Sequence, residues 1–207
     1  MAILKKTTDR SVGIDAMTKE EILEAAAQII REKGFHAASM QDIAKAVDLQ
    51  KASLYYHVSS KQEILVDLLD LALAQLNQNI EAVVVEDLPA DEKFRKALRA
   101  YLNYTAENLD LAAVLLLEHR SLEPEFRARH IPLRDRYESY WQQIIEEGIQ
   151  EGIFEMLDVQ LAVKAVLGVA NWTVMWLNPK GKLTATEIAD FSADLLLGGF
   201  YKREAKP

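Results

Sequence analysis

The chain has 207 residues, of which 50% are hydrophobic, and a formal net charge of −8, a balance that excludes wholesale disorder. It has no cysteine, which excludes a disulfide scaffold, a thiolate metal site and a cysteine nucleophile. No apolar run approaches the ~20 residues that span a bilayer, and residues 1–13 lack the apolar segment of a signal peptide, so we expect a cytoplasmic protein with no membrane partner.

Helical spacing recurs along the chain and strand-like alternation does not, so we predict an all-α fold of about nine helices. The expected helices are about residues 18–33, 39–47, 50–56, 60–84, 91–107, 109–119, 124–152, 158–177 and 184–201. Thr18, Ser60 and Thr184 each precede a glutamate by three residues, a capping-box pattern that marks a helix start. Pro132 should kink or interrupt the seventh helix, because proline removes a backbone donor and clashes with the preceding turn.

Residues 39–57 have the spacing of a helix-turn-helix, in which two short helices flank a three-residue turn at 47–49. The positions expected to pack the two helices together are Met40, Ile43, Ala44, Val47, Leu49, Leu54 and Tyr55. The outward positions of the second helix, which can reach base edges and phosphates, are Gln50, Lys51, Ser53, Tyr56 and His57. Spacing alone equally allows an ordinary helical hairpin with a solvated polar face.

The sequence around this motif resembles the DNA-binding domain of the TetR family of transcriptional regulators over residues 18–68. The matching blocks, which keep the family's order and spacing, are residues 22–26, 32–35, 39–44, 54–58 and 60–65. The resemblance implies a three-helix DNA-binding domain followed by a larger ligand-binding and dimerisation domain. We therefore expect a flexible tail at 1–17, a helix-turn-helix domain at 18–62, and an effector-binding and dimerisation domain at 63–207.

The charge distribution fits such a division. Residues 1–61 hold nine Lys/Arg and eight Asp/Glu for a net charge of +1, whereas residues 62–207 hold fifteen and twenty-four for a net charge of −9. Screening limits electrostatic reach to about 8 Å at physiological salt, so DNA responds to the local field and not to the charge of the whole chain. The overall acidity therefore does not exclude DNA binding by the N-terminal part.

Several DNA contacts follow from the resemblance. It implies that Tyr55 packs at the recognition helix and reaches a phosphate, and that Lys61 contacts the DNA backbone. Ser39 and Gln41 lie at a helix N-terminus that commonly touches phosphate. By the same resemblance, Lys51, Ser53 and Tyr56 read or flank bases, and we include Gln50 and His57 because they lie on the same outward face.

Three positions of the motif depart from the family pattern. Asp48 stands where a turn glycine is usual, Gln50 where a Ser or Thr cap is common, and Val58 where an aromatic residue is usual. Aspartate tolerates a left-handed backbone better than most residues, so we expect the turn to form with Asp48 in that conformation.

The last two predicted helices indicate a dimer. Residues 161–176 are apolar on nearly all sides, and a helix of this kind must be buried on all sides. We predict a symmetric homodimer joined by a four-helix bundle of the last two helices of each chain, with a monomer that has one bulky core as the alternative. The expected interface residues are Val166, Val169, Phe191, Leu195 and Phe200.

The C-terminal part also suggests an effector. Asn171, Trp172 and Trp176, followed by a turn at 178–181, resemble a TetR subgroup that regulates fatty-acid, steroid-ring and phenylacetate breakdown and often responds to acyl-CoA thioesters. Such a ligand needs an apolar tunnel and basic groups for its phosphates, and residues 119–136 are rich in Arg and His. The expected ligand-binding residues are Arg120, Arg134, Tyr137, Tyr140, Trp141, Asn171, Trp172 and Trp176. Alternatively, the arginines form surface ion pairs and the aromatic residues are core.

The sequence lacks a glycine-rich phosphate loop, an HExxH motif and a nucleophile elbow, so we expect no catalytic residue, metal or cofactor. We predict a ligand-responsive regulator, a homodimer that binds a double-stranded DNA operator and is released from it by a small apolar effector. That effector is either an acyl-CoA thioester or a lipophilic drug-like compound. An all-helical enzyme acting on acyl-CoA and a helical interaction protein without DNA function are the other hypotheses.

Overall fold

The computed structural model describes residues 18–156 and 158–201, and within these ranges the chain forms nine α-helices and two 3-10 helices. The elements are α1 (Lys19–Lys33), α2 (Met40–Ala46), α3 (Lys51–Leu54), α4 (Lys61–Val84), α5 (Ala90–Glu107), α6 (Leu109–Glu118), η1 (His119–Ser121), α7 (Pro124–Gln150), α8 (Val159–Trp172), η2 (Thr173–Met175) and α9 (Ala185–Phe200). The all-α prediction is confirmed. The tail expected at 1–17 lies outside the described residues.

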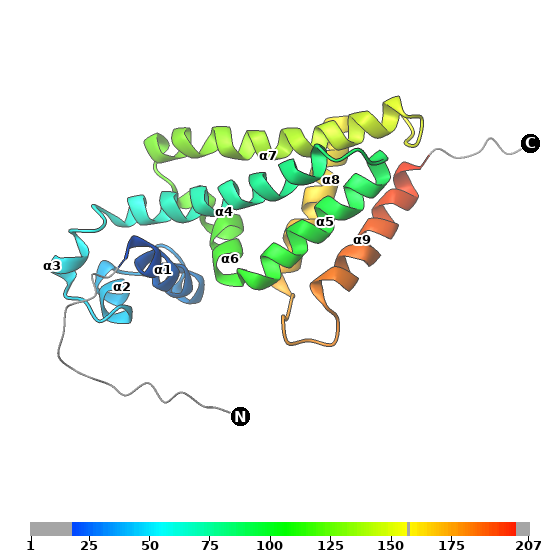
Figure 1. Cartoon of the computed structure of the whole chain (residues 1–207). Helices are drawn as coiled ribbons and strands as arrows, with labels where there is room; N and C mark the ends of the chain where they lie inside the picture. The colour runs from blue at the N-terminus through cyan, green and yellow to red at the C-terminus, as the bar shows by residue number, and fades with distance from the viewer. Residues whose placement is uncertain (1–17, 157, 202–207) are drawn as a thin grey trace, which may run out of the picture.

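The helices form two groups that α4 connects (Figure 1). Helices α1, α2 and α3 gather at one end, and α5, α8 and α9 lie at the other. Helix α4 leaves the first group and runs along α7, with which it packs extensively, while α1 rests against α6. None of the helices in the described part of the chain is both long and apolar enough to cross a membrane.

The helix starts follow the predicted capping residues with one difference. Thr18 and Thr184 form reciprocal capping boxes with the glutamates three residues on, and Ser39 forms one with Asp42. Ser60 accepts the backbone N–H of Glu63, but the Glu63 carboxylate turns away and accepts the backbone N–H of Ser59 at 2.6 Å. The reciprocal half of that predicted box is therefore wrong, because Ser59 offers this carboxylate both its N–H and its hydroxyl.

Two expectations about helix length need correction. Helix α3 is only four residues long, and residues 55–57 form a turn instead of a further helical turn. Helix α7 continues through Pro132 without interruption. Pro132 and Ala128, whose carbonyl loses its helical donor, are both exposed, so water can satisfy that carbonyl.

The core extends along α4 and α7. Helix α4 buries a stripe of apolar residues that includes Leu65, Leu69 and Leu76. Trp141 of α7 is fully buried, with its ring edge-on to Phe94 at 5.6 Å between centroids. At the end of α7, a Cβ on Gly148 would lie 2.2 Å from the Phe154 ring. Only glycine therefore lets the chain fold back there.

Candidate functional site

The α2–turn–α3 segment has the packing of a helix-turn-helix. Met40, Ile43 and Leu54 are buried between the two helices. In the turn, Asp48 has φ = 53°, in the left-handed region, and the backbone N–H of Leu49 donates to the carbonyl of Ala44 at 2.8 Å. The expected turn forms with aspartate in the place of glycine.

The predicted DNA-binding side chains of α3 and of the residues beside it are available on the surface. Tyr56 is 92% exposed, Gln50 and Lys51 are exposed, and Ser53 and His57 are half-buried. Tyr55 is 47% exposed, so its assignment to the core between the two helices is wrong. Its ring lies just past the end of α3, where the backbone has already left the helix.

The residues at the start of α2 are also exposed, and one of them is engaged in capping. The Ser39 hydroxyl accepts the N–H of Asp42 at 3.1 Å, and Gln41 points to solvent. Lys33 lies 2.8 Å from the Asp42 carboxylate and, with Ser39, holds its pKa well below the usual range. Asp42 therefore stays ionised and keeps the capping box formed.

Lys61 stabilises the loop between α1 and α2. Its ammonium group donates to the carbonyls of Phe35 and Ala38, each at 2.7 Å, and lies 4.4 Å from the centroid of the Phe35 ring. Lys61 therefore holds the loop between α1 and α2 against the start of α4. Its contact with DNA phosphate stays a prediction.

A cavity of about 840 Å³ lies among α4, α5, α6, α7 and α8. Its apolar wall includes leucines of α4 and α6, and its polar part contains three arginines and two histidines. Five of the predicted ligand-binding residues line it, namely Arg120, Arg134, Tyr137, Asn171 and Trp172. Tyr140, Trp141 and Trp176 lie outside the lining, because Trp141 is in the core, the Tyr140 hydroxyl accepts from Arg136, and Trp176 is on the surface.

Sequence reasoning missed the cavity residues of α4 and α6, which include Leu73, Leu76, Leu115 and Leu116. The available signal was the composition of α6, which is apolar around its whole circumference although the helix is short. Such a helix has one face on the core and another on a second apolar space.

The arginines of the cavity region differ in how their charges are compensated. Arg134 pairs with Asp135 at 3.0 Å, and Arg127 donates to the carbonyl of Leu122 at 2.9 Å. Within the described part of the chain, the exposed guanidinium of Arg120 has neither a hydrogen bond nor an ion pair. Among the described residues, the cavity therefore presents two guanidinium groups that pair with no carboxylate, those of Arg120 and Arg127, and only the Arg120 group also lacks a hydrogen bond.

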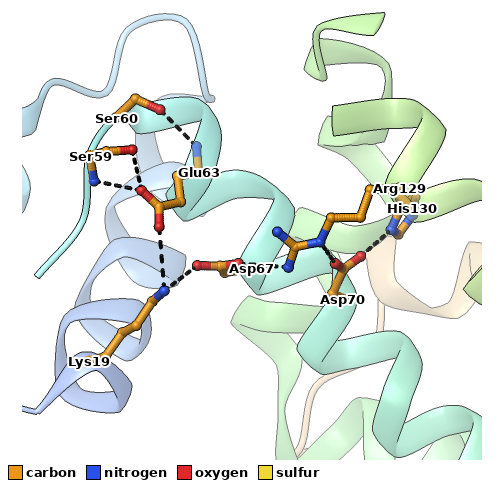
Figure 2. Close-up of polar contacts among 8 residues, drawn as sticks. All are labelled: Lys19, Ser59, Ser60, Glu63, Asp67, Asp70, Arg129 and His130. Carbon is orange, nitrogen blue, oxygen red and sulfur yellow. Dashed lines mark hydrogen bonds and ion pairs between the residues drawn. The ribbon is translucent and has the colours of Figure 1, made fainter. Parts of the chain in front are cut away.

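A chain of polar contacts, made of ion pairs and one histidine–carboxylate contact, connects the cavity wall to the DNA-binding end (Figure 2). His130 Nδ1, on the cavity wall, lies 3.1 Å from Asp70, which lies 2.9 Å from Arg129. Arg129 also lies 3.0 Å from Asp67, and the other oxygen of Asp67 lies 2.7 Å from Lys19 of α1. We call these five residues the α1–α4–α7 relay.

Only three of the five predicted dimer-interface residues on α8 and α9 are exposed. Val166 and Phe200 are buried in the core of the chain itself, so their assignment to the interface is wrong. Phe191 and Leu195 are 71% and 65% exposed, and Val169 is 37% exposed. A Cβ added at Gly168, Gly198 or Gly199 would meet nothing within 4 Å, so these backbones are open to close approach.

Comparison with known proteins places the chain in a family. A family model described as "Tetracyclin repressor-like, C-terminal domain" matches residues 87–200, and one described as "Bacterial regulatory proteins, tetR family" matches residues 22–68. The TetR family regulator PfmR from Thermus thermophilus is 40% identical, with 86% of this chain and 97% of PfmR covered and a TM-score of 0.80.

Two further solved structures are similar along their length. AibR, solved with isovaleryl coenzyme A and operator DNA, is 26% identical, with 86% of this chain and 97% of AibR covered and a TM-score of 0.80. FadR from Bacillus subtilis, solved with stearoyl-CoA, is 29% identical, with the same two coverages and a TM-score of 0.72. This chain belongs to the TetR family of bacterial transcriptional regulators, a family of DNA-binding proteins and not of enzymes.

Proposed function

We propose that the protein is a repressor that binds operator DNA as a homodimer and leaves it when an acyl-CoA thioester fills the cavity. The observation that carries the proposal is the composition of the 840 Å³ cavity, which joins a leucine-rich wall to a group of cations that includes the unpaired Arg120. The apolar part suits an acyl chain, and the cations suit the phosphates of coenzyme A. The complexes of AibR and FadR with acyl-CoA support this ligand class.

The DNA-binding part follows from the exposed surface of α3 and of the residues directly before and after it. In this proposal residues 18–62 are the DNA-binding domain, residues 63–207 bind the effector and the second protomer, and the protein acts in the cytoplasm. Gln50, Lys51 and Tyr56 enter the major groove, and two copies meet half-sites about 34–36 Å apart. The structure of AibR with operator DNA supports the binding of operator DNA.

Replacing Arg120 with alanine should raise the dissociation constant for an acyl-CoA by about tenfold, since a hydrogen bond to a charged group contributes roughly 1.5–3 kcal/mol. The matched control is Arg136→Ala, because Arg136 pairs with Glu81 at 3.0 Å and lies outside the cavity lining. Calorimetric titration with acyl-CoA esters of several chain lengths measures both variants. Operator release by the same esters, followed by mobility shift, then tests the repressor function.

Two results would contradict the assignment. Equal ester affinity in the Arg120→Ala variant and the wild type would exclude the phosphate contact. Thermal stabilisation and operator release by neutral lipophilic compounds, with no response to any CoA ester, would assign the cavity to a drug-like effector instead.

The effector must also favour the released conformation over the DNA-bound one. The α1–α4–α7 relay supports such coupling, because His130 lines the cavity whereas Lys19 belongs to the helix that packs on the reading motif. Glu118 gives a second connection, since it lies between two cavity residues, Leu117 and His119, and accepts the N–H of Phe35 at 3.1 Å. A shift of α6 or α7 on ligand binding therefore moves groups that hold the DNA-binding domain.

Replacing Asp67 with asparagine should weaken this coupling, because the amide cannot hold both Lys19 and Arg129 by charge. The factor by which a saturating effector changes affinity at a second site is usually 5–150-fold. We expect Asp67→Asn to reduce the factor by which saturating acyl-CoA weakens operator binding about fivefold. The measurement is operator affinity with and without the ester. Glu86→Gln, which removes one charge from the exposed pair with Lys96 beyond α4, is the control. Undiminished coupling in Asp67→Asn would exclude the relay.

A further inference from the structure

One amide group lies in the wall of the cavity, on α8. Asn171 is half-buried, and its Oδ1 accepts a hydrogen bond from the Tyr101 hydroxyl at 2.7 Å. Tyr101, on α5, is itself buried and also lines the cavity. The hydrogen bond fixes which side of the amide faces Tyr101, so the NH₂ group of Asn171 is turned away from it.

The donor side of this amide lacks a protein partner. Among the residues that the structure describes, Nδ2 of Asn171 makes no hydrogen bond, although Asn171 borders the cavity. A half-buried donor without a partner costs free energy unless a solvent or ligand atom accepts from it. Nδ2 is not among the buried side-chain atoms that lack a partner, so it is accessible at the cavity wall and available to a ligand acceptor that replaces solvent there.

The surroundings restrict the kind of acceptor. Burial raises the pKa of Tyr101 and of Tyr137, the neighbouring cavity tyrosine, far above the usual range, so both hydroxyls stay protonated. The rings of these tyrosines lie 6.4 Å apart between centroids, and Leu167 and Val174 add apolar surface to the same cavity. A neutral carbonyl fits such surroundings better than a carboxylate, because an ionised group would lose its hydration there.

We propose that Asn171, oriented by Tyr101, is the specificity-determining residue that donates a hydrogen bond to the thioester carbonyl of the effector. This inference rests on the proposed function, since it assumes that the ligand is an acyl-CoA. The thioester carbonyl is the acceptor that joins the acyl chain to the coenzyme, and an S-alkyl-CoA thioether of equal length lacks it. Discrimination between the two compounds is therefore the property that Asn171 provides.

The test compares an acyl-CoA with the matching S-alkyl-CoA thioether by calorimetric titration of the full-length protein. We expect the wild type to bind the thioester about tenfold more tightly, and Asn171→Ala to bind both compounds equally. Tyr101→Phe, which keeps the ring but frees the amide, should lose most of the preference. Asn103→Ala is the control, because Asn103 also accepts from a hydroxyl, that of Thr186 at 3.1 Å, but lies outside the cavity lining.

The outcomes separate this inference from the proposed function. Equal affinity of the wild type for thioester and thioether, with operator release by both, would overturn the role of Asn171 and leave the repressor intact. A preference that persists in both Asn171→Ala and Tyr101→Phe would overturn it as well. Binding of neither compound to the wild type would overturn the acyl-CoA assignment and with it the inference.

Discussion

Replacing Lys51 and Tyr56 together with alanine should lower operator affinity by about two orders of magnitude or more, with the melting temperature unchanged. Each base contact contributes roughly 1–3 kcal/mol of discrimination, and a dimer loses each contact twice. Tyr56 is 92% exposed and Lys51 is exposed, so neither side chain supports the core. A mobility-shift titration, on an operator selected from random DNA with the wild type, measures the change.

The salt dependence of binding separates the two contributions. Loss of a phosphate contact by Lys51 reduces the slope of log affinity against log salt, whereas loss of a base contact relaxes sequence preference. Lys182→Ala, an exposed lysine in the loop before α9, serves as the control. Wild-type operator affinity in the double variant would show that α3 is not the reading helix.

Replacing Phe191 and Leu195 together with glutamate should convert the dimer to a monomer and reduce operator affinity at least about a hundredfold. Both side chains are exposed on α9 of the isolated chain, and an interface on this face would bury four carboxylates without partners. A monomer reads one half-site and loses the effective concentration that links the two readers. Sedimentation velocity measures the mass, and the same mobility-shift titration measures operator binding.

The control for this variant is Leu71→Glu, since Leu71 is a half-exposed leucine of α4 away from the α8–α9 face. The double variant should keep its helical circular dichroism, because neither residue belongs to the core of the chain. A dimeric mass for the double variant would place the interface on another surface.

The sequence predicts local features of this fold well. Capping residues act within one helical turn, so Thr18, Ser39 and Thr184 mark their helices correctly. The helix-turn-helix is also local, and the left-handed backbone at Asp48 follows from the residues that tolerate it. The four-residue length of α3 was less predictable, because no single residue ends it.

The wrong assignments at the predicted dimer interface concern residues for which the sequence allows two apolar surroundings, the core of the chain and the interface. Val166 and Phe200 belong to helices that are apolar on the core side and on the open side, so periodicity cannot tell which side each residue faces. Trp141 was expected in the cavity because it follows an arginine-rich stretch, but its helical position turns it toward Phe94. The contacts of Lys61 with the carbonyls of Phe35 and Ala38 could not be predicted from the sequence, because those residues lie more than twenty positions away along the chain.

The backbone at Asp48 has a consequence for how this motif can evolve. Because φ is 53° there, only glycine, asparagine and aspartate occupy the position at low cost, although the side chain is exposed. A single nucleotide change converts an aspartate codon to a codon for either of the other two. Substitution among these three residues should therefore be tolerated at this turn. A β-branched residue should destabilise the turn through backbone strain alone, although the exposed side chain makes no contact within the described part of the chain that the change would remove.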